Sequence, residues 1–359
     1  MRTFVTFGEA LLRLSPPGHH RLGQPGSQFE IGPAGAELNV ACALSTWNNN
    51  VRYVTALPTD NPLADQLLSK VQSYGVDTEY IVRRSGRVGL VFVETGASQR
   101  PSRVHYDRSH SSMSLASFSE FEWDKIFSSA THLHITGITP ALSEHAAHAT
   151  IEAAKYAKQS GLYISCDLNF RSKLWQWSRE RSGRSLAEKI MREIMPEIDL
   201  LIANETDLAD VLGIHSETAE GAIDIEAFAH LARRAADAYP NLSYVAITLR
   251  ESLSASHNRW GALLLQRPED RIYFAPENNG VYQPYDIDTI IDRVGAGDAF
   301  AAGLLHALNS DQNWTPSEAL GFAVAASCLA HSIPGDINHS KLGEIQGLTE
   351  GNHTGRVVR

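Results

Sequence analysis

Residues 290–308, which read IIDRVGAGDAFAAGLLHAL, place two glycines and an aspartate where an apolar run turns into a helix. Glycines let backbone N–H groups converge, and a helix start adds unsatisfied donors and a positive dipole end. The turn formed by Gly295, Ala296 and Gly297 is therefore suited to bind an anion such as a phosphate. Asp298 has two alternative roles. It is either a cap of the helix, or a general base for a hydroxyl that attacks a phosphorus held by these amides.

Other common motifs of phosphate binding and hydrolysis are missing from the sequence. It has no GxxxxGK[ST] element, so the P-loop mechanism lacks its lysine, and its glycines are not spaced as GxGxxG. It also has no HExxH and no GxSxG. Capping and phosphoryl transfer remain the two interpretations of the turn.

Two segments resemble the signatures of a known family. DRVGAGDAFAAG, residues 292–303, resembles the C-terminal signature of the ribokinase-like (PfkB) sugar kinases, and GPAGAELNVACALSTW, residues 32–47, resembles their N-terminal signature. The resemblance covers residues 3–348 and implies an ATP- and Mg²⁺-dependent sugar kinase. In this family the amides of the GAGD turn hold the transferred phosphate, and the aspartate, here Asp298, activates the sugar hydroxyl. The resemblance thus favours a catalytic role over capping.

Polar residues in three segments, GAELN, HYDRSHSS and DLNFRSKLW, bear on the substrate. Arg108 in HYDRSHSS and Arg171 in DLNFRSKLW would each alone be read as surface charges. Because arginine binds carboxylates through a planar fork, the two together suit a sugar acid better than a neutral sugar. Both segments resemble those of the family's 2-keto-3-deoxygluconate kinases, which phosphorylate an acidic keto sugar at its terminal hydroxyl. The expected substrate-binding residues are Gly35, Asn39, Tyr106, Arg108, Asp167, Asn169 and Arg171.

The nucleotide side departs from the family pattern. ANETDLADVLG resembles the family's N-x-x-E element, which organises Mg²⁺ and phosphate, but it reads Asn204, Glu205, Thr206, Asp207. Either the shorter acid Asp207 or its neighbour Glu205 then fills the acidic position, and acids in the first turn of a helix are the structural alternative.

Further nucleotide contacts are expected from two later segments. Thr248 and Arg250 stand where many relatives have a glycine-rich turn against the nucleotide. Gly335, Asp336 and Asn338 resemble a segment that flanks the adenine in relatives, and a plain turn is the structural alternative for them. Asp292 matches a position that holds a monovalent cation in some relatives.

The chain alternates short apolar runs with segments of helical period, which predicts an α/β fold with a mainly parallel sheet covered by helices on both faces. The strand-like segments 12–34 and 87–112 interrupt the alternation and are either surface loops or a small β-sheet lid, and the family resemblance favours the lid. One kinase domain is expected over residues 1–350, followed by a flexible tail, 351–359.

Bulk properties limit the partners. With 43% apolar and 20% charged residues and a net charge of −10, the chain resembles a globular protein that binds small molecules, and no surface for nucleic acid or membrane is expected. Three scattered cysteines and the absence of a signal-peptide pattern favour the cytoplasm. The expected partners are a sugar acid and ATP, and a homo-oligomer is expected through the lid.

Two alternatives to a kinase of a sugar acid stay open. One is a fructokinase- or ribokinase-like enzyme that acts on a neutral sugar. The other is a catalytically silent sugar-binding regulator on the same fold.

Overall fold

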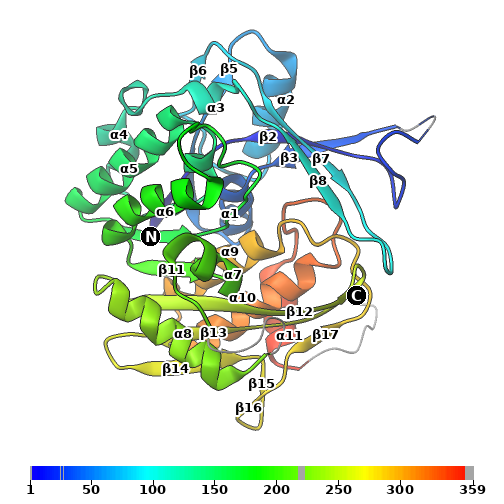
Figure 1. Ribbon diagram of the computed structural model, residues 1–359, viewed down its shortest axis with the longest axis vertical. Helices are drawn as coiled ribbons and strands as arrows, with labels where there is room; N and C mark the ends of the chain where they lie inside the picture. Colours follow the sequence, from blue (N-terminus) through cyan, green and yellow to red (C-terminus); the bar gives the residue numbers. More distant parts are fainter. Residues whose placement is uncertain (1, 25, 27, 217–222, 352–359) are drawn as a thin grey trace.

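The computed structural model of the protein describes residues 2–24, 26, 28–216 and 223–351 (Figure 1). In these residues the main element is a nine-stranded sheet of order β14-β13-β12-β11-β10-β9-β1-β4, with β17 also paired to β13. The strands from β12 to β4 run parallel, whereas β13 pairs antiparallel with its three neighbours. The strands are β1 (Thr3–Phe7), β4 (Asn50–Val54), β9 (His132–Thr136), β10 (Tyr163–Asp167), β11 (Leu200–Ala203), β12 (Tyr244–Ser254), β13 (His257–Gln266), β14 (Arg271–Ala275) and β17 (Tyr285–Ile287).

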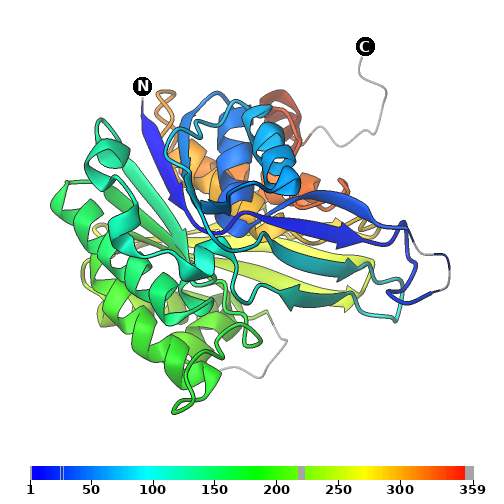
Figure 2. The same cartoon turned by 90° about the horizontal axis from the view of Figure 1, so that it is seen from above.

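Helices cover both faces of this sheet, as Figure 2 shows. Successive side chains of a strand point to opposite faces, so Leu201 of β11 packs into one core cluster and Ile202 into the other. One face carries α4 (Trp123–Phe127), α5 (Glu144–Gln159), α6 (Gly183–Ile194) and α8 (Ile225–Ala238). The other carries α1 (Ala36–Thr46), α2 (Pro62–Gln72), α9 (Ala296–Leu308), α10 (Pro316–Ala330) and α11 (Leu342–Thr349).

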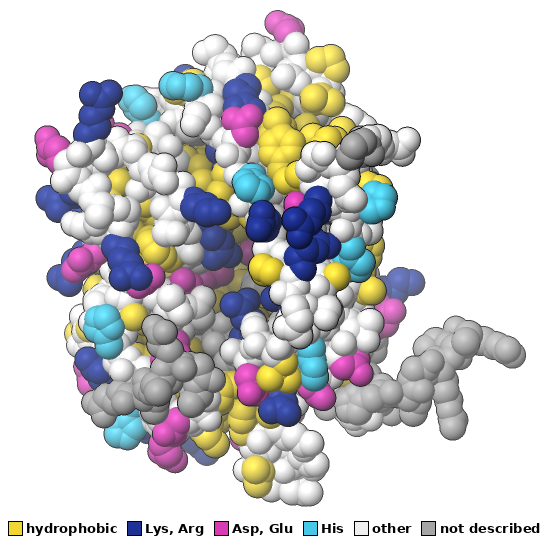
Figure 3. Space-filling view, turned by 45° about the vertical axis from the view of Figure 1, so that its right-hand side comes forward, with side chains coloured by type: hydrophobic (Ala, Val, Ile, Leu, Met, Phe, Trp, Pro, Cys, Tyr) yellow, Lys and Arg dark blue, Asp and Glu magenta, His cyan; other side chains and the backbone are white. Residues whose placement is uncertain are grey.

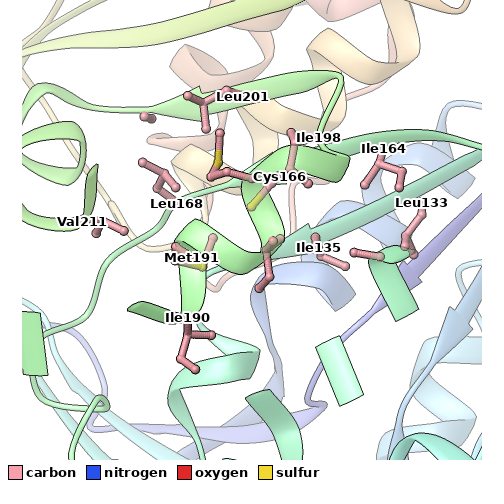
Figure 4. Close-up of a cluster of buried hydrophobic side chains, with 14 of the residues drawn as sticks. Leu133, Ile135, Ile164, Cys166, Leu168, Ile190, Met191, Ile198, Leu201 and Val211 are labelled. Atoms are coloured by element: carbon pink, nitrogen blue, oxygen red, sulfur yellow. The ribbon is translucent and has the colours of Figure 1, made fainter. Parts of the chain in front are cut away.

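The first of these cores shows how the layers lock together. Figure 4 shows Ile135, Cys166 and Leu201 from three neighbouring strands beside Ile190 and Met191 of α6. All five side chains are buried, so the strand order is held by apolar packing as well as by backbone hydrogen bonds. This packing gives the loops at the carboxyl ends of the strands a rigid base.

A separate four-stranded sheet projects from the main body, with its cyan strands at the upper right of Figure 1. Its order is β3-β2-β7-β8, and its strands are β2 (Leu11–Ser15), β3 (Glu30–Ala34), β7 (Gly89–Glu94) and β8 (Arg103–Asp107). Val91 and Val93 of β7 form a small apolar cluster with Leu11 and Ala34 on one face of this sheet. This is the predicted small sheet, and below it is called the lid sheet.

The remaining elements are short. They are strands β5 (Ala56–Pro58), β6 (Val82–Arg84), β15 (Glu277–Asn278) and β16 (Val281–Tyr282), and helices α3 (Ser112–Leu115) and α7 (Glu205–Asp207). None of the helices in the described part of the chain is long and apolar enough to span a lipid bilayer.

Most predicted elements are present, with one clear difference near the start of the chain. The run TFVTFGEALLRLS, residues 3–15, has the apolar pattern of a single strand, but it contains β1 and β2, which belong to different sheets. The chain leaves the main sheet after Gly8, whose N–H donates a hydrogen bond to the carbonyl of Val54 in β4. The predicted tail lies outside the described residues except at Gly351.

Candidate active site

A cleft of about 600 Å³ lies between the lid sheet and the carboxyl ends of the parallel strands. This is the position at which open α/β sheets bind ligands. Figure 3 shows a hollowed region near the middle of one face, bordered by Lys and Arg side chains in dark blue. The predicted site residues that line the cleft are Gly35, Asn39, Tyr106, Arg108, Asp167, Asn169, Arg171, Asn204, Glu205, Asp207, Thr248, Arg250, Gly295, Ala296, Gly297, Asp298 and Asp336.

The glycine-rich turn forms the start of α9 and faces this cleft. Gly295 is the residue before the helix and has φ 83°, a left-handed conformation that favours glycine. A Cβ at this position would also collide with the backbone oxygen of Asp336, whereas a Cβ at Gly297 would meet no atom within 4 Å. The helix has no side-chain cap, so its first N–H groups are directed toward the cleft without an intrahelical partner. The turn can therefore bind an anion.

Asp298 lies in the first turn of α9 and bonds to a residue from the other end of the chain. Its Oδ2 accepts a hydrogen bond of 2.7 Å from Nδ2 of Asn39 on α1. Burial raises the pKa of Asp298 to about 7, although the Asn39 bond opposes the shift. A carboxyl group that gains and loses a proton near neutral pH is suited to act as a general base. The start of α9 has no side-chain capping hydrogen bond, although Asp298 is an acid in its first turn and so complements the helix dipole.

Two further acids stand near Asp298 at the ends of neighbouring strands. Asp167 ends β10, and burial together with the charges of Asp207 and Asp298 raises its pKa well above the usual value. Burial also raises the pKa of Asp207 to about 6, while the charge of Arg171 lowers it. The floor of the cleft thus concentrates negative charge next to one arginine. Such an arrangement calls for a cation or for protonation.

The residues for Mg²⁺ were expected in the segment after β11, which is α7. Asn204 caps this short helix, because its Oδ1 accepts from the amide of Asp207 at 2.8 Å and its Nδ2 donates to the carboxylate at 2.9 Å. In the described residues no group of three or more His, Cys, Asp or Glu side chains is arranged to hold a metal. Mg²⁺ commonly binds through one or two carboxylates, water and substrate phosphates. The buried Asp207 and its neighbour Glu205 fit that pattern.

Arg108 reaches the cleft from the end of the lid sheet and is already paired. Its Nε donates a short hydrogen bond to Oε2 of Glu9, and both side chains are buried. In the described part of the chain neither Nη group of Arg108 bonds to the protein. Arg171, on the other wall, is exposed, and among the described residues it donates only to the carbonyl of Phe170. Both arginines therefore have N–H groups free to bind a ligand.

The predicted nucleotide residues separate into two groups. Thr248 and Arg250 belong to β12, which forms a long hairpin with β13, and both line the cleft. Gly335 and Asn338 do not line it. The Asn338 amide is buried, donating to the carbonyl of Ala326 and accepting from the amide of Ser340, so this side chain holds a turn together.

Asp292, expected to hold a monovalent cation, is bound to an arginine instead. Its Oδ2 lies 2.5 Å from Nη2 of Arg13, and Nη1 of the same guanidinium lies 2.5 Å from Oδ1 of Asp336. The other Asp292 oxygen accepts from the amide of Val294. A metal cation at this carboxylate would have to displace a buried arginine, so the residues present do not fit one.

The sequence interpretation did not assign roles to several residues that contact the site, among them Glu9, which pairs with Arg108, and Arg13, which pairs with Asp336. Both lie in the opening segment GEALLRLS, where charges interrupt an apolar run. Glu37 is a third residue without an assigned role. It is fully buried and accepts hydrogen bonds from Thr136 and Thr139. For Glu9 and Arg13, the available signal was a charged residue flanked by apolar residues in a strand-like run. The sequence did not identify their partners, which lie far away along the chain.

The fold agrees with the similarity of the chain to known proteins. The family model described as pfkB family carbohydrate kinase matches residues 1–232 and 256–341. The chain belongs to this family.

The names of three similar proteins differ in the substrate that they state. A 2-dehydro-3-deoxygalactonokinase of Haloferax volcanii is 30% identical over 354 residues, with 98% of each chain covered. The crystal structure of 2-dehydro-3-deoxygluconokinase from Thermotoga maritima is 40% identical with a TM-score of 0.88, covering 98% of this chain and all of that one. Fructokinase-2 of Solanum lycopersicum is 26% identical over 348 residues, covering 96% of this chain and 92% of its own.

Proposed function

We propose that the protein transfers the γ-phosphate of ATP to the terminal hydroxyl of a 2-keto-3-deoxy sugar acid, with 2-keto-3-deoxygluconate as the first candidate. The observation that carries the proposal is that Asp298, Arg108 and Arg171 line one cleft. A base and an anion-binding turn serve phosphoryl transfer, and two arginines serve a carboxylate. Two of the similar proteins bear names of such kinases.

The roles of the residues follow from their places around the cleft. The substrate hydroxyl gives its proton to Asp298 while its oxygen forms a bond to the γ-phosphorus, and the bond from phosphorus to the leaving ADP oxygen breaks. The amides of the Gly295–Gly297 turn stabilise the charge on the transferred group. Bound Mg²⁺ would neutralise phosphate charge, and Asp207 and Glu205 would hold it.

Binding of the sugar and of the nucleotide is divided between the walls. Tyr106, Arg108, Gly35 and Asn39 would contact the sugar from the lid side, with Asp167, Asn169 and Arg171 opposite. Thr248 and Arg250 would contact the phosphates from β12. The apolar face of the lid sheet would exclude water from the γ-phosphate, which limits wasteful hydrolysis.

One observation favours a neutral sugar as the second candidate. The charge of Arg108 is already compensated by Glu9, so its attraction for a substrate carboxylate is reduced. A fructokinase also stands among the similar proteins. For a neutral sugar, Arg108 would donate to a hydroxyl or keto oxygen.

A coupled ADP-release assay decides between the two. The purified protein would be tested with 2-keto-3-deoxygluconate, 2-keto-3-deoxygalactonate, fructose and ribose, each with Mg²⁺ and with EDTA. We expect kcat/KM for at least one acid to exceed that for the neutral sugars by at least 100-fold. A higher kcat/KM for fructose or ribose would contradict the proposal, and binding of sugar without ADP release would indicate the silent regulator. Mass spectrometry and ³¹P NMR of the product would locate the phosphate.

A further inference from the structure

The pairing of Arg13 with two aspartates joins three parts of the fold. Arg13 lies on β2 of the lid sheet, Asp292 precedes the glycine turn, and Asp336 follows α10. All three side chains are buried, with exposed fractions of 6–7%. The Nε of Arg13 also donates to Oγ of Ser15 at 2.7 Å, which fixes the plane of the guanidinium.

The charges of this cluster require a cation. Two buried carboxylates repel each other, and an unpaired buried charge is strongly destabilising. Burial alone would lower the pKa of Arg13, but the charges of Asp336 and Asp292 outweigh it and raise that pKa. Arginine stays charged in proteins, so the positive charge between the two acids is permanent.

The same cluster holds the anion-binding turn in place. Oδ2 of Asp292 accepts from the amide of Gly335 as well as from Arg13, and its Oδ1 accepts from the amide of Val294. The backbone oxygen of Asp336 packs against Gly295, where a Cβ would collide with it. Arg13 therefore bonds to Asp292, which precedes the turn, and to Asp336, which packs against its first glycine, and among the described residues no hydrogen bond joins it to Asp298.

We propose that the guanidinium of Arg13 is a built-in cation that positions the anion-binding turn through Asp292 and Asp336, so that phosphoryl transfer by this protein needs no monovalent metal ion. Arg13 is a positioning residue, since it acts through the turn. Its nitrogens take the carboxylate oxygens that a metal ion would use, and its charge repels a second cation. The inference rests on the kinase class of the protein and not on which sugar it phosphorylates.

The first test uses the unmodified protein. Its thermal unfolding and its kcat with the best sugar would be measured in tetramethylammonium buffer, with KCl or with tetramethylammonium chloride at equal ionic strength. We expect kcat to agree within twofold and Tm within about 1 °C. Activation of several-fold by KCl, or stabilisation by KCl alone, would overturn the proposal. The Tm comparison needs no substrate, so it is independent of the function proposed above.

The second test uses Arg13→Ala, with Arg103→Ala as the control. Arg103 is exposed on β8 of the same sheet, and the described residues give it no ion pair. We expect Arg13→Ala to lower kcat at least tenfold with little change in the KM of the sugar, and guanidinium at about 10 mM to recover part of kcat where tetramethylammonium does not. A folded Arg13→Ala protein with normal kcat and no added cation would overturn the proposal. If this variant does not fold, the first test still decides.

Discussion

Nδ2 of Asn39 donates a hydrogen bond of 2.7 Å to Oδ2 of Asp298, which joins α1 to the first turn of α9 inside the cleft. The two residues are 259 positions apart in the sequence. The bond holds the carboxylate in one orientation and leaves its other oxygen, Oδ1, for a substrate hydroxyl. It also opposes the effect of burial on the pKa of Asp298. Four predictions follow from this site.

The first prediction concerns the proposed base. Asp298→Asn should lower kcat by at least about 10³-fold while both substrates still bind, because the amide cannot accept the proton. Steady-state kinetics and calorimetric binding measure the two effects. Asp311→Asn, at an exposed turn position, is the matched control and should keep normal turnover. Turnover of Asp298→Asn near that of the control would contradict the assignment.

The same substitution should stabilise the free protein. The pKa of Asp298 is raised from 3.8 to about 7 on folding, so the folded state binds the proton more tightly and loses stability as pH rises between those values. At pH 8 the asparagine variant should therefore have the higher Tm. Its unfolding free energy should be larger by an amount on the order of a few kcal/mol. The difference should close near pH 4. A lower Tm for the variant at pH 8 would argue against the buried, uncompensated carboxylate.

The second prediction concerns the pH dependence of catalysis. Because Asp298 must be ionised to accept a proton, kcat/KM should be level above about pH 7 and fall tenfold per unit below it. Asn39→Ala removes a bond that lowers this pKa, so its acid limb should move to higher pH. The measurement is a profile of kcat/KM from pH 5.5 to 9 for both proteins. An unchanged or lower limb in the variant would show that Asn39 does not set this pKa.

The third prediction concerns the buried pair of Glu9 and Arg108. Arg108→Met leaves the carboxylate of Glu9 buried without a cation, so it should lower the unfolding free energy by about 3–5 kcal/mol. Adding Glu9→Gln should recover most of this loss, because the uncompensated charge is then removed. Denaturant unfolding of the wild type, both single variants and the double variant gives the coupling energy. Additive losses would contradict a direct ion pair.

The pair also separates stability from specificity. In the Glu9→Gln/Arg108→Met protein, kcat/KM for the sugar acid should stay reduced by about 10- to 100-fold after stability is recovered, because the carboxylate has lost a partner. A neutral sugar should lose less. Equal losses for both sugars would remove Arg108 from the carboxylate site.

The fourth prediction uses the two glycines of the turn as a matched pair. Gly295→Ala should destabilise the protein by about 1–3 kcal/mol or more, because alanine is strained at φ 83° and its Cβ collides with the backbone of Asp336. Gly297→Ala should leave Tm within about 1 °C, because its Cβ meets open space. Its effect should appear in turnover, since Gly297 lines the cleft. Thermal unfolding and kcat of both variants test this, and equal Tm losses would contradict the geometry.

Much of the fold could be predicted from the hydrophobic periodicity of the sequence and from the spacing of its motifs. The alternation of apolar runs and helical segments predicted the parallel sheet with two helical layers, because each strand between two layers must be apolar on both faces. The pattern could not divide residues 3–15 into β1 and β2, since both strands are apolar and the short break between them adds only one charged residue, Glu9. The small sheet was predicted as an alternative to loops, and its strands pair across long stretches of chain.

For the site, the sequence by itself determined which side chains are candidates for the chemistry. The local pattern of glycines and an acid at a helix start left capping and a general base as alternatives, and the resemblance of GAGD and of the Asn39 segment to the family signatures favoured the base. Only the tertiary structure decided their partners: Asn39 on Asp298, Glu9 on Arg108, and Arg13 between Asp292 and Asp336. Burial and charge pairing depend on distances between residues far apart in the chain, and spacing along the sequence does not contain those distances.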